Sequence, residues 1–310
     1  MQRHATNQII MTPPLQFGFN EQTGLDNHFQ QRSLLTPKQI TEQAICEFNA
    51  AVKQLKQSGI SVIEFANPSE RLIPDAVFLN NWFSTDQQGS LFVYPMKTRN
   101  RQGEVVPIAL KDSLTSHGFT VNKIHDVAQL IKPSLILEGT GALVFDHINR
   151  IAYAAQSERC DADLMVEFCR AHQWQPIMFT TQSSNGKPIY HTNVMMSIGD
   201  KFAVVCLECI DRQHRQTVKQ SLQNNGKTVI DITLQQMEQS FCGNILQLVD
   251  ANDSPIIVMS SSAHRGFNQQ QKDTLASFGK LIQCDIPTIE SVGGGSLRCM
   301  IAENFLTKCN

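Results

Sequence analysis

A helix followed by a strand recurs five times along the chain, and this repetition constrains the fold more than any other feature. Each helical segment ends at a glycine or a polar break, and an apolar, strand-like run follows it. The five copies lie at residues 36–65, 104–124, 160–179, 211–233 and 267–286. Such regular self-similarity is typical of a repeat architecture.

The first copy shows the pattern most clearly. Thr36 is suited to cap a helix, with Pro37 in its first turn and Gln39 completing a capping box. Apolar residues then recur at helical spacing until about Gln57, and Gly59 is expected to stop the helix. The β-branched run that follows predicts a strand.

A second apolar run that carries polar residues follows each copy. One polar position per run recurs at intervals of 63, 53, 53 and 55 residues, and these positions are Asp75, Glu138, His191, Asn244 and Cys299. A solenoid needs polar caps at its ends, whereas the first and last copies look like the others, so we favour a closed ring. Closure brings equivalent positions together. We therefore predict an α/β fold of five pseudo-symmetric units, forming one domain over residues 1–310, with the five marked residues at its centre.

The composition is that of an ordinary globular protein, with 41% hydrophobic residues and a formal net charge of −2. Because there are no basic runs, we expect neither a nucleic acid nor an anionic membrane as a partner. The first residues lack the apolar region of a signal peptide, and no stretch approaches the ~20 apolar residues of a membrane span, so we expect a cytoplasmic protein. The nine cysteines are irregularly spaced, which predicts free thiols.

Three of the marked positions carry the residue types of nucleophilic catalysis. Cys299 follows three consecutive glycines, where the backbone can approach a ligand closely. His191 follows a polar loop and is expected at the end of a strand, and Glu138 lies in an apolar run where an unpaired carboxylate is costly. Together they can supply a nucleophile, an acid or base, and an orienting group. Taken singly, Cys299 and His191 each also have a purely structural interpretation.

Arginines and a second cysteine motif complete the set of candidates. Arg159 lies where an expected strand becomes a helix, and Arg99 and Arg101 lie in a polar stretch. For each arginine a solvated side chain is the ordinary outcome, and capture of a substrate carboxylate is the functional one. Cys206 and Cys209 have the spacing of a metal motif, but no second pair completes four zinc ligands. We interpret these two cysteines as structural.

These motifs resemble, in the same order and spacing, those of the guanidino-group-modifying enzymes: arginine deiminase, dimethylarginine dimethylaminohydrolase and the amidinotransferases. The segments that carry the resemblance are PDAVFLNN, LEGTGALVF, YHTN and GGGSLRCM. The chain looks most similar to bacterial amidinotransferase-like proteins linked to citrulline use. The resemblance implies a five-bladed α/β propeller, also called a pentein. It also implies Cys299 as nucleophile, His191 as general acid and base, and Glu138 as the carboxylate that orients this histidine.

The resemblance further implies a set of substrate contacts. Asp75 would bind the α-amine of an amino-acid substrate and Arg159 its α-carboxylate, with Arg101 or the neighbouring Gln102 as a second carboxylate ligand. No metal or organic cofactor is implied, and the expected partner is a small-molecule amino acid. Association into a homo-oligomer is left open.

The chain departs from the family pattern where relatives grip a guanidinium. Asn80 and Asn81 stand in place of a Glu-Asp pair, and Asn193 replaces the Asp of a His-x-Asp motif. A guanidinium offers only donors and favours carboxylates, whereas the carbonyl oxygen of a neutral ureido group can accept from an Asn amide. Alternatively, the asparagines are tolerated replacements in a protein that retains arginine chemistry, or they are signs of an altered activity.

The sequence therefore predicts a cysteine-dependent hydrolase. It would cleave a C–N bond in the ureido or guanidino group of a citrulline- or arginine-like amino acid through a covalent thiol adduct. The Gly293–Gly295 loop or the asparagines would stabilise the tetrahedral charge. Two alternatives remain: an amidinotransferase that passes the group to an amine, and a non-catalytic protein that binds citrulline or arginine in the same pocket.

Overall fold

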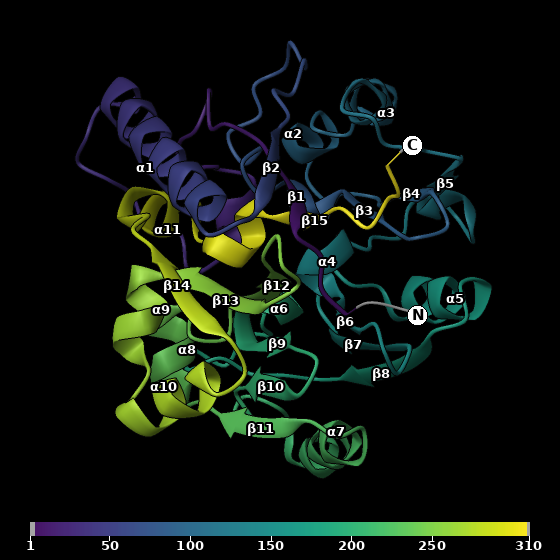
Figure 1. Ribbon diagram of the computed structural model, residues 1–310, viewed down its shortest axis with the longest axis vertical. Helices are drawn as coiled ribbons and strands as arrows, with labels where there is room; N and C mark the ends of the chain where they lie inside the picture. The colour runs from purple at the N-terminus through teal and green to yellow at the C-terminus, as the bar shows by residue number, and fades with distance from the viewer. Residues whose placement is uncertain (1–3, 309–310) are drawn as a thin grey trace.

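Five three-stranded sheets form a ring in the computed structural model, which describes residues 4–308 (Figure 1). In every sheet the middle strand pairs antiparallel with one neighbour and parallel with the other. The sheets are β15 (Ala302–Glu303), β1 (Gln8–Met11) and β2 (Ser61–Glu64); β3 (Phe83–Thr85), β4 (Ser90–Val93) and β5 (Lys123–Asp126); β6 (Val144–Asp146), β7 (Ile151–Ala155) and β8 (Gln175–Phe179); β9 (Met196–Ile198), β10 (Phe202–Val205) and β11 (Thr228–Asp231); β12 (Leu246–Val249), β13 (Pro255–Ser260) and β14 (Lys280–Cys284).

The first and last strands of the described chain close the ring. β15 pairs antiparallel with β1, and Ile10 lies opposite Ala302. On its other side β1 pairs in parallel with β2, with Ile10 opposite Ile63. The sheet that joins the two ends therefore has the same arrangement as the other four. This closure confirms the predicted α/β ring and excludes a solenoid.

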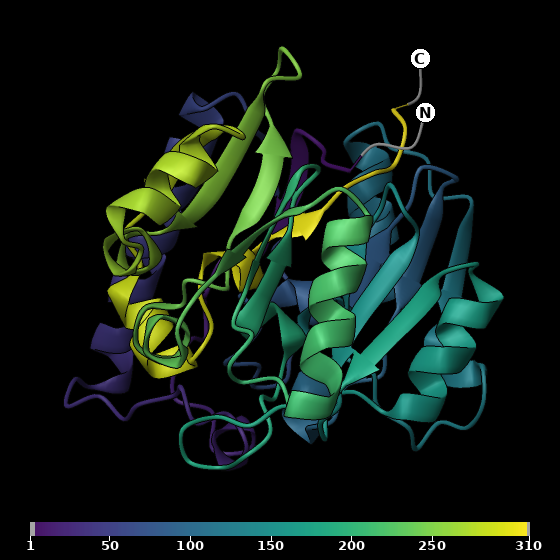
Figure 2. The ribbon, with the colours of Figure 1, turned by 90° about the horizontal axis from the view of Figure 1, so that it is seen from below.

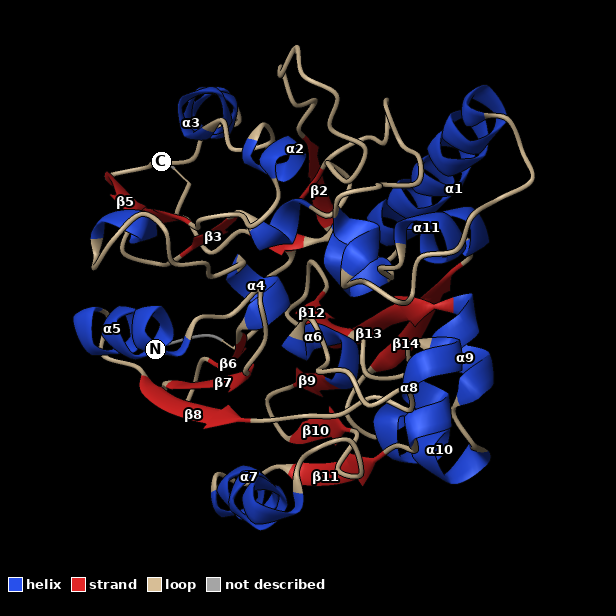
Figure 3. Ribbon diagram, turned by 180° about the vertical axis from the view of Figure 1, so that it is seen from behind, coloured by secondary structure: helices blue, strands red, loops and turns tan. Residues whose placement is uncertain are grey.

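At least one helix per unit covers the outer side of the ring (Figures 1 and 3). In each unit the helix connects the middle strand to its parallel neighbour, because parallel pairing of consecutive strands requires a crossover. Figure 2 shows α7 in front of its sheet. The five helices, which match the five predicted copies, are α1 (Pro37–Gln57), α3 (Pro107–Ser116), α5 (Ala162–Ala171), α7 (Arg212–Asn224) and α10 (Gln269–Ala276).

Helix α1 begins as its sequence predicts. The Thr36 hydroxyl accepts from the backbone N–H of Gln39, and the Gln39 side chain accepts from the backbone N–H of Thr36, so the capping box is present. Gly59 has φ +86°, which glycine adopts without strain, and it lies between the helix and β2. The buried face of α1 packs against β2 and α11 (Pro287–Gly293), and its residues are Ile40, Ala44, Phe48, Ala51, Val52 and Leu55.

Short helical turns lie at the centre of the ring. Those that precede the antiparallel edge strand of a sheet are η2 (Leu79–Asn81), α4 (Gly139–Ala142), α6 (Thr192–Met195) and η4 (Leu297–Met300). Helix α4 contacts η2 and α6, and η2 contacts η4. The motif-bearing runs of four units therefore meet at the axis. The other short helices are α2 (Arg99–Gln102), α8 (Leu234–Ser240), α9 (Ser261–Gly266), η1 (Thr23–Leu25) and η3 (Val127–Gln129).

The expected position of His191 at the end of a strand is wrong. His191 is the N-cap of α6, and β9 begins only after that turn. Glu138 caps α4 in the same way, so these two residues are true structural equivalents. Asp75 lies three residues before the corresponding cap of η2, and Cys299 lies three residues after that of η4. These two residues converge with the others because neighbouring turns meet, and not because their positions are strictly equivalent.

The eight cysteines within the described residues are all free thiols, as predicted, and Cys309 lies outside those residues. The Cys209 thiol donates to the backbone carbonyl of Cys206 at 3.1 Å, and both residues are buried. Within residues 4–308, no group of three His, Cys, Asp or Glu side chains is placed to hold a metal ion. No helix of this part of the chain is long and apolar enough to cross a membrane.

Candidate active site

A small cavity at the centre of the ring brings together six of the residues singled out from the sequence. Its lining includes Asp75, Asn81, Arg101, Arg159, His191 and Cys299. These residues come from four different units, and all of them are buried. Glu138 lies behind His191, and Asn193 reaches the sulfur of Cys299. Of the proposed site residues, only Asn80 directs its side chain away from this cavity.

His191, Glu138 and Arg159 form a connected chain. The Nε2 atom of His191 lies 2.8 Å from Oε2 of Glu138, and Nη1 of Arg159 donates to the same oxygen at 3.0 Å. Burial opposes ionisation of Glu138, but the charge of Arg159 and the hydrogen bond from His191 hold its pKa well below the ordinary value. An ionised carboxylate only accepts, so Nε2 of His191 carries a proton.

The imidazole of His191 is neutral near pH 7. Burial lowers its pKa, although Glu138 acts in the opposite direction. Because Nε2 carries the proton toward Glu138, Nδ1 has the free lone pair. Nδ1 of His191, at the centre of the five-sheet ring, can therefore accept a proton.

Two amides face the sulfur of Cys299. The Nδ2 atom of Asn244 lies 3.2 Å from the sulfur, and that of Asn193 lies 3.6 Å from it. Burial raises the pKa of the thiol, while the hydrogen bond from Asn244 lowers it. Asn244 is itself fixed, because it donates to the Asn193 carbonyl at 2.8 Å and accepts from the Arg298 N–H at 3.1 Å. The repeat marked Asn244, but sequence reasoning gave it no role in the site.

The glycines before Cys299 do not present the Gly294 N–H to a ligand. Gly294, with φ +64°, ends α11, and its N–H donates to the Glu290 carbonyl at 2.9 Å. The carbonyls of Gly293 and Gly294 accept from Asn27 at 3.3 and 3.2 Å. Among the described residues, the groups that donate to the sulfur are the side-chain amides of Asn193 and Asn244.

Gly141 is required by close packing inside the site. A Cβ atom at this position would lie 2.2 Å from Nδ2 of Asn81 and 2.9 Å from the ring of His191. Contacts below 3.0 Å force a neighbour to move. The second glycine of the LEGTGALVF motif therefore leaves the space that the imidazole and the Asn81 amide occupy.

The neighbouring asparagines point in different directions. Asn81 lines the cavity, and its Oδ1 atom accepts from Nη1 of Arg101 at 2.7 Å, while its buried Nδ2 atom has no hydrogen-bond partner among the described residues. Asn80 donates to the hydroxyl of Thr140 at 3.1 Å and does not line the cavity.

Arg101, and not Gln102, is the residue of α2 that reaches the cavity. Gln102 donates to the Met96 carbonyl at 3.0 Å. The guanidinium of Arg101 forms a two-point contact with Glu104, at 3.0 and 2.9 Å. Arg101 is therefore occupied by protein partners and orients Asn81.

A segment that precedes α1 covers the cavity. The side chains of Asn20 and Thr23 donate to Oδ2 of Asp75 at 2.7 and 2.9 Å, while Oδ1 of Asp75 is buried without a partner among the described residues. Asp26 forms two hydrogen bonds with Arg159. The cavity enclosed in this way measures only about 10 Å³. Sequence reasoning missed Asp26, since nothing in the surrounding residues marks it.

The family model for eukaryotic N,N-dimethylarginine dimethylhydrolase matches residues 13–306. The chain belongs to this family. Its members are hydrolases that act on non-peptide C–N bonds of amidines. The wider superfamily expected from the sequence is confirmed, while the finer likeness to bacterial citrulline-linked proteins stays a prediction.

Solved structures show the same fold in other members of the superfamily. The substrate-bound N-terminal domain of ArgZ, an arginine dihydrolase from Cyanobacteria, matches with TM-score 0.68 and 16% identity over 96% of this chain and 99% of that chain. A dimethylarginine dimethylaminohydrolase adduct with S-methyl-L-thiocitrulline matches with TM-score 0.65 and 14% identity over 98% and 100% of the two chains. No curated protein sequence matches the chain. The predicted pentein fold is confirmed.

In this member of the dimethylarginine dimethylhydrolase family, the central residues are of the types that nucleophilic catalysis needs. A thiol, a neutral imidazole and an ionised carboxylate lie within one buried cluster. Amide donors surround the thiol and can stabilise negative charge on it or beside it.

Proposed function

We propose that the protein is a cysteine-dependent hydrolase of the ureido group of a citrulline-like amino acid. The orientation of the Asn81 amide carries this proposal. Because Arg101 donates to Oδ1, the amide cannot flip, and Nδ2 remains as a buried donor without a partner among the described residues. A ureido carbonyl oxygen would satisfy this donor. A guanidinium has no acceptor and would place donor against donor.

The absence of a carboxylate at two positions beside the cavity and the thiol supports the same substrate. Asn81 and Asn193 are neutral, whereas arginine and methylated arginines carry a cationic group. Loss of a charge-assisted hydrogen bond costs a cationic substrate about 1.5 to 3 kcal/mol. A neutral ureido group does not incur this loss.

The amino-acid end of the substrate would bind at the covering segment. Oδ1 of Asp75 is a buried acceptor without a partner among the described residues, suited to an α-ammonium group. Arg159 would take the α-carboxylate once Asp26 withdraws, since a guanidinium binds either carboxylate in the same two-point manner. These two contacts favour an amino acid over a simple urea.

The reaction would proceed through a thiocarbamate of Cys299, in which the sulfur carries the carbamoyl group. His191 takes the thiol proton, and the sulfur attacks the ureido carbon while the amides of Asn81 and Asn244 stabilise the oxyanion. His191 then returns the proton to the leaving nitrogen as the C–N bond breaks. Water, activated by His191, cleaves the C–S bond of the thiocarbamate, which releases a carbamate and regenerates the thiol. The free thiols also lead us to propose a cytoplasmic location.

A substrate comparison tests the proposal. We expect the protein to turn over citrulline faster than arginine, dimethylarginine or agmatine at matched concentration. The rate is measured as release of ammonia or amine. Cys299→Ser should abolish turnover, while Cys46→Ser, at an exposed thiol, should not. Faster turnover of arginine or dimethylarginine would contradict the ureido preference. Binding of citrulline without turnover would favour the non-catalytic alternative, and transfer to an added amine would favour the amidinotransferase.

A further inference from the structure

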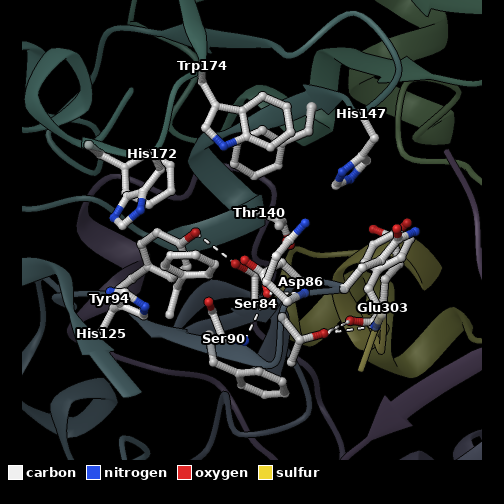
Figure 4. A pocket seen from close by; sticks show the side chains of 18 of the residues that line it. Ser84, Asp86, Ser90, Tyr94, His125, Thr140, His147, His172, Trp174 and Glu303 are labelled. Carbon is white, nitrogen blue, oxygen red and sulfur yellow. Dashed lines mark hydrogen bonds between the residues drawn. The ribbon is translucent and has the colours of Figure 1, made fainter. Parts of the chain in front are cut away.

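A second and much larger cavity lies away from Cys299. Its volume is about 610 Å³, within the usual range for small-molecule sites of roughly 300–1,000 Å³. Residues of the β3-β4-β5 sheet, the β6-β7-β8 sheet and the last described segment line it, and no lining residue is shared with the cavity beside Cys299 (Figure 4). Nothing in the proposed hydrolytic reaction uses this space.

Aromatic and imidazole rings form much of the cavity wall. The ring of His125 stacks on Phe92 at 5.0 Å, and His172 lies edge-on to Phe92 at 4.8 Å. In Figure 4, Trp174 lies across the cavity from His125, and its ring is 5.5 Å from that of His147. Flat walls of this kind favour a planar ligand, because ring pairs gain most from stacked or edge-to-face contact.

The three imidazoles are free to bind such a ligand. No ring nitrogen of His125, His147 or His172 forms a hydrogen bond with another residue in the described part of the chain. Burial lowers the pKa of all three side chains, so each imidazole is neutral and offers one donor and one acceptor. A planar ring that carries its own donors and acceptors matches these groups better than a hydrocarbon does.

The charged groups of the cavity are balanced. The Arg150 guanidinium lies 4.0 Å above the Trp174 ring and donates to backbone carbonyls. Oδ1 of Asp86 accepts from backbone N–H groups at 2.9 and 2.8 Å, whereas Oδ2 has no hydrogen-bond partner among the described residues. Glu303 is paired with Arg298 at 3.2 Å. The cavity therefore suits an uncharged ligand with a hydroxyl group that can donate to Asp86.

From the stacked rings, the unpaired imidazoles and the free carboxylate oxygen, we propose that this cavity binds a nucleoside. The base would lie between the aromatic walls and exchange hydrogen bonds with the imidazoles. The sugar hydroxyls would donate to Oδ2 of Asp86, with the amides of Gln87 and Gln173 beside them in the lining. The proposal is independent of the reaction at Cys299.

Calorimetric titration of the full chain with adenosine and guanosine tests this assignment. We expect at least one of them to bind saturably, with a Kd below about 1 mM. The chain has two tryptophans, and Trp82 is buried elsewhere, so ligand-induced quenching should come from Trp174 and disappear in Trp174→Phe while calorimetric binding persists. Absence of saturable binding by both nucleosides would overturn the proposal.

Two variants connect the binding to the cavity. His172→Phe keeps the ring but removes its nitrogens, and should weaken binding about tenfold, as expected for a lost hydrogen bond. Ala171→Trp, at the exposed end of α5, should fill the cavity and abolish binding without disturbing the fold. His117→Phe, the same substitution at the C-cap of α3, serves as control. Binding that survives Ala171→Trp, or tighter binding of indole-3-acetate than of either nucleoside, would contradict a neutral nucleoside ligand.

Discussion

Asp26 and Arg159 are joined by two hydrogen bonds, from Nε to Oδ2 at 2.8 Å and from Nη2 to Oδ1 at 2.5 Å. The Arg159 guanidinium, which is proposed to bind a substrate carboxylate, is thus already paired with the Asp26 carboxylate of the covering segment. The cavity of about 10 Å³ beside Cys299 has room for no more than a water molecule. An amino acid can reach the thiol only if Asp26 is displaced.

Asp26→Asn should lower KM for citrulline. The neutral amide competes less well for Arg159 than the substrate carboxylate does, so a KM several-fold lower is expected, with kcat little changed. Steady-state kinetics measure this effect. Glu21→Gln, which removes the exposed pair with Arg32 in the same segment, is the matched control. A raised KM in Asp26→Asn would instead indicate that Asp26 binds the substrate.

Arg159→Ala should impair catalysis as well as binding. Arg159 donates to Glu138 at 3.0 Å, and its removal leaves that buried carboxylate without its cation, so His191 loses a fully ionised partner. We expect kcat to fall for citrulline and for its decarboxylated analogue N-carbamoylputrescine, whereas KM should rise for citrulline alone. Arg170→Ala, at an exposed pair, is the control. An unchanged kcat for the analogue would limit Arg159 to carboxylate binding.

Asn244→Asp should move the ascending limb of the pH profile to higher pH. Burial already raises the pKa of Cys299, and the Asn244 donor counteracts this. A carboxylate 3.2 Å from the sulfur removes the donor and repels the thiolate, so kcat/KM should reach its plateau at higher pH than in the wild type. The profile and the rate of thiol alkylation, both measured against pH, should shift together. An unchanged alkylation profile would show that Asn244 does not act on the thiol.

Gly141→Ala should lower kcat/KM by about 100-fold or more, because a small displacement of catalytic groups has an effect of this size. The added methyl carbon would lie 2.2 Å from the Asn81 amide and 2.9 Å from the His191 ring. Gly18→Ala, where a methyl meets no atom within 4 Å, should retain activity. Thermal unfolding of both variants separates loss of site geometry from loss of fold. Wild-type activity in Gly141→Ala would refute the packing argument.

The ring and the convergence of the motifs follow from local signals. The Thr36 capping box and the breaks at Gly59, Gly118 and Gly226 determine where helices begin and end, and glycine at positive φ is needed at these three breaks. Because the same signals recur at a near-constant interval, the pairing of each helix with its strand repeats as well. Local chemistry therefore predicts the repeat, and symmetry predicts which runs meet.

Contacts that depend on irregular backbone could not be predicted. Asp26 lies outside the repeats, and its partner Arg159 is 133 residues away. Asn80 and Asn81 are neighbours, but the turn of η2 directs one amide to Thr140 and the other to Arg101. Asn244 was located by its interval, yet its role appears only when its amide is seen 3.2 Å from the sulfur.

The substrate preference should be reversible at Asn81 and Asn193. Carboxylates at these positions restore acceptors for a guanidinium, and each charge-assisted bond is worth about 1.5 to 3 kcal/mol, so the Kd for arginine should fall by at least tenfold in Asn81→Asp with Asn193→Asp. Citrulline turnover should decrease, because an acid in place of the Asn81 donor repels the developing oxyanion.

The single variants separate two effects that the double variant combines. The amide of Asn193 lies 3.6 Å from the sulfur, so Asn193→Asp also raises the pKa of Cys299 and slows the attack on any substrate, whereas Asn81→Asp retains the contact with Arg101 and changes mainly the substrate-facing atom. Asn80→Asp is the matched control: it makes the same change one residue away, beside Thr140 and outside the cavity. If Asn80→Asp improves arginine binding as much as Asn81→Asp does, the effect is one of general charge, and the orientation of the Asn81 amide does not determine the substrate.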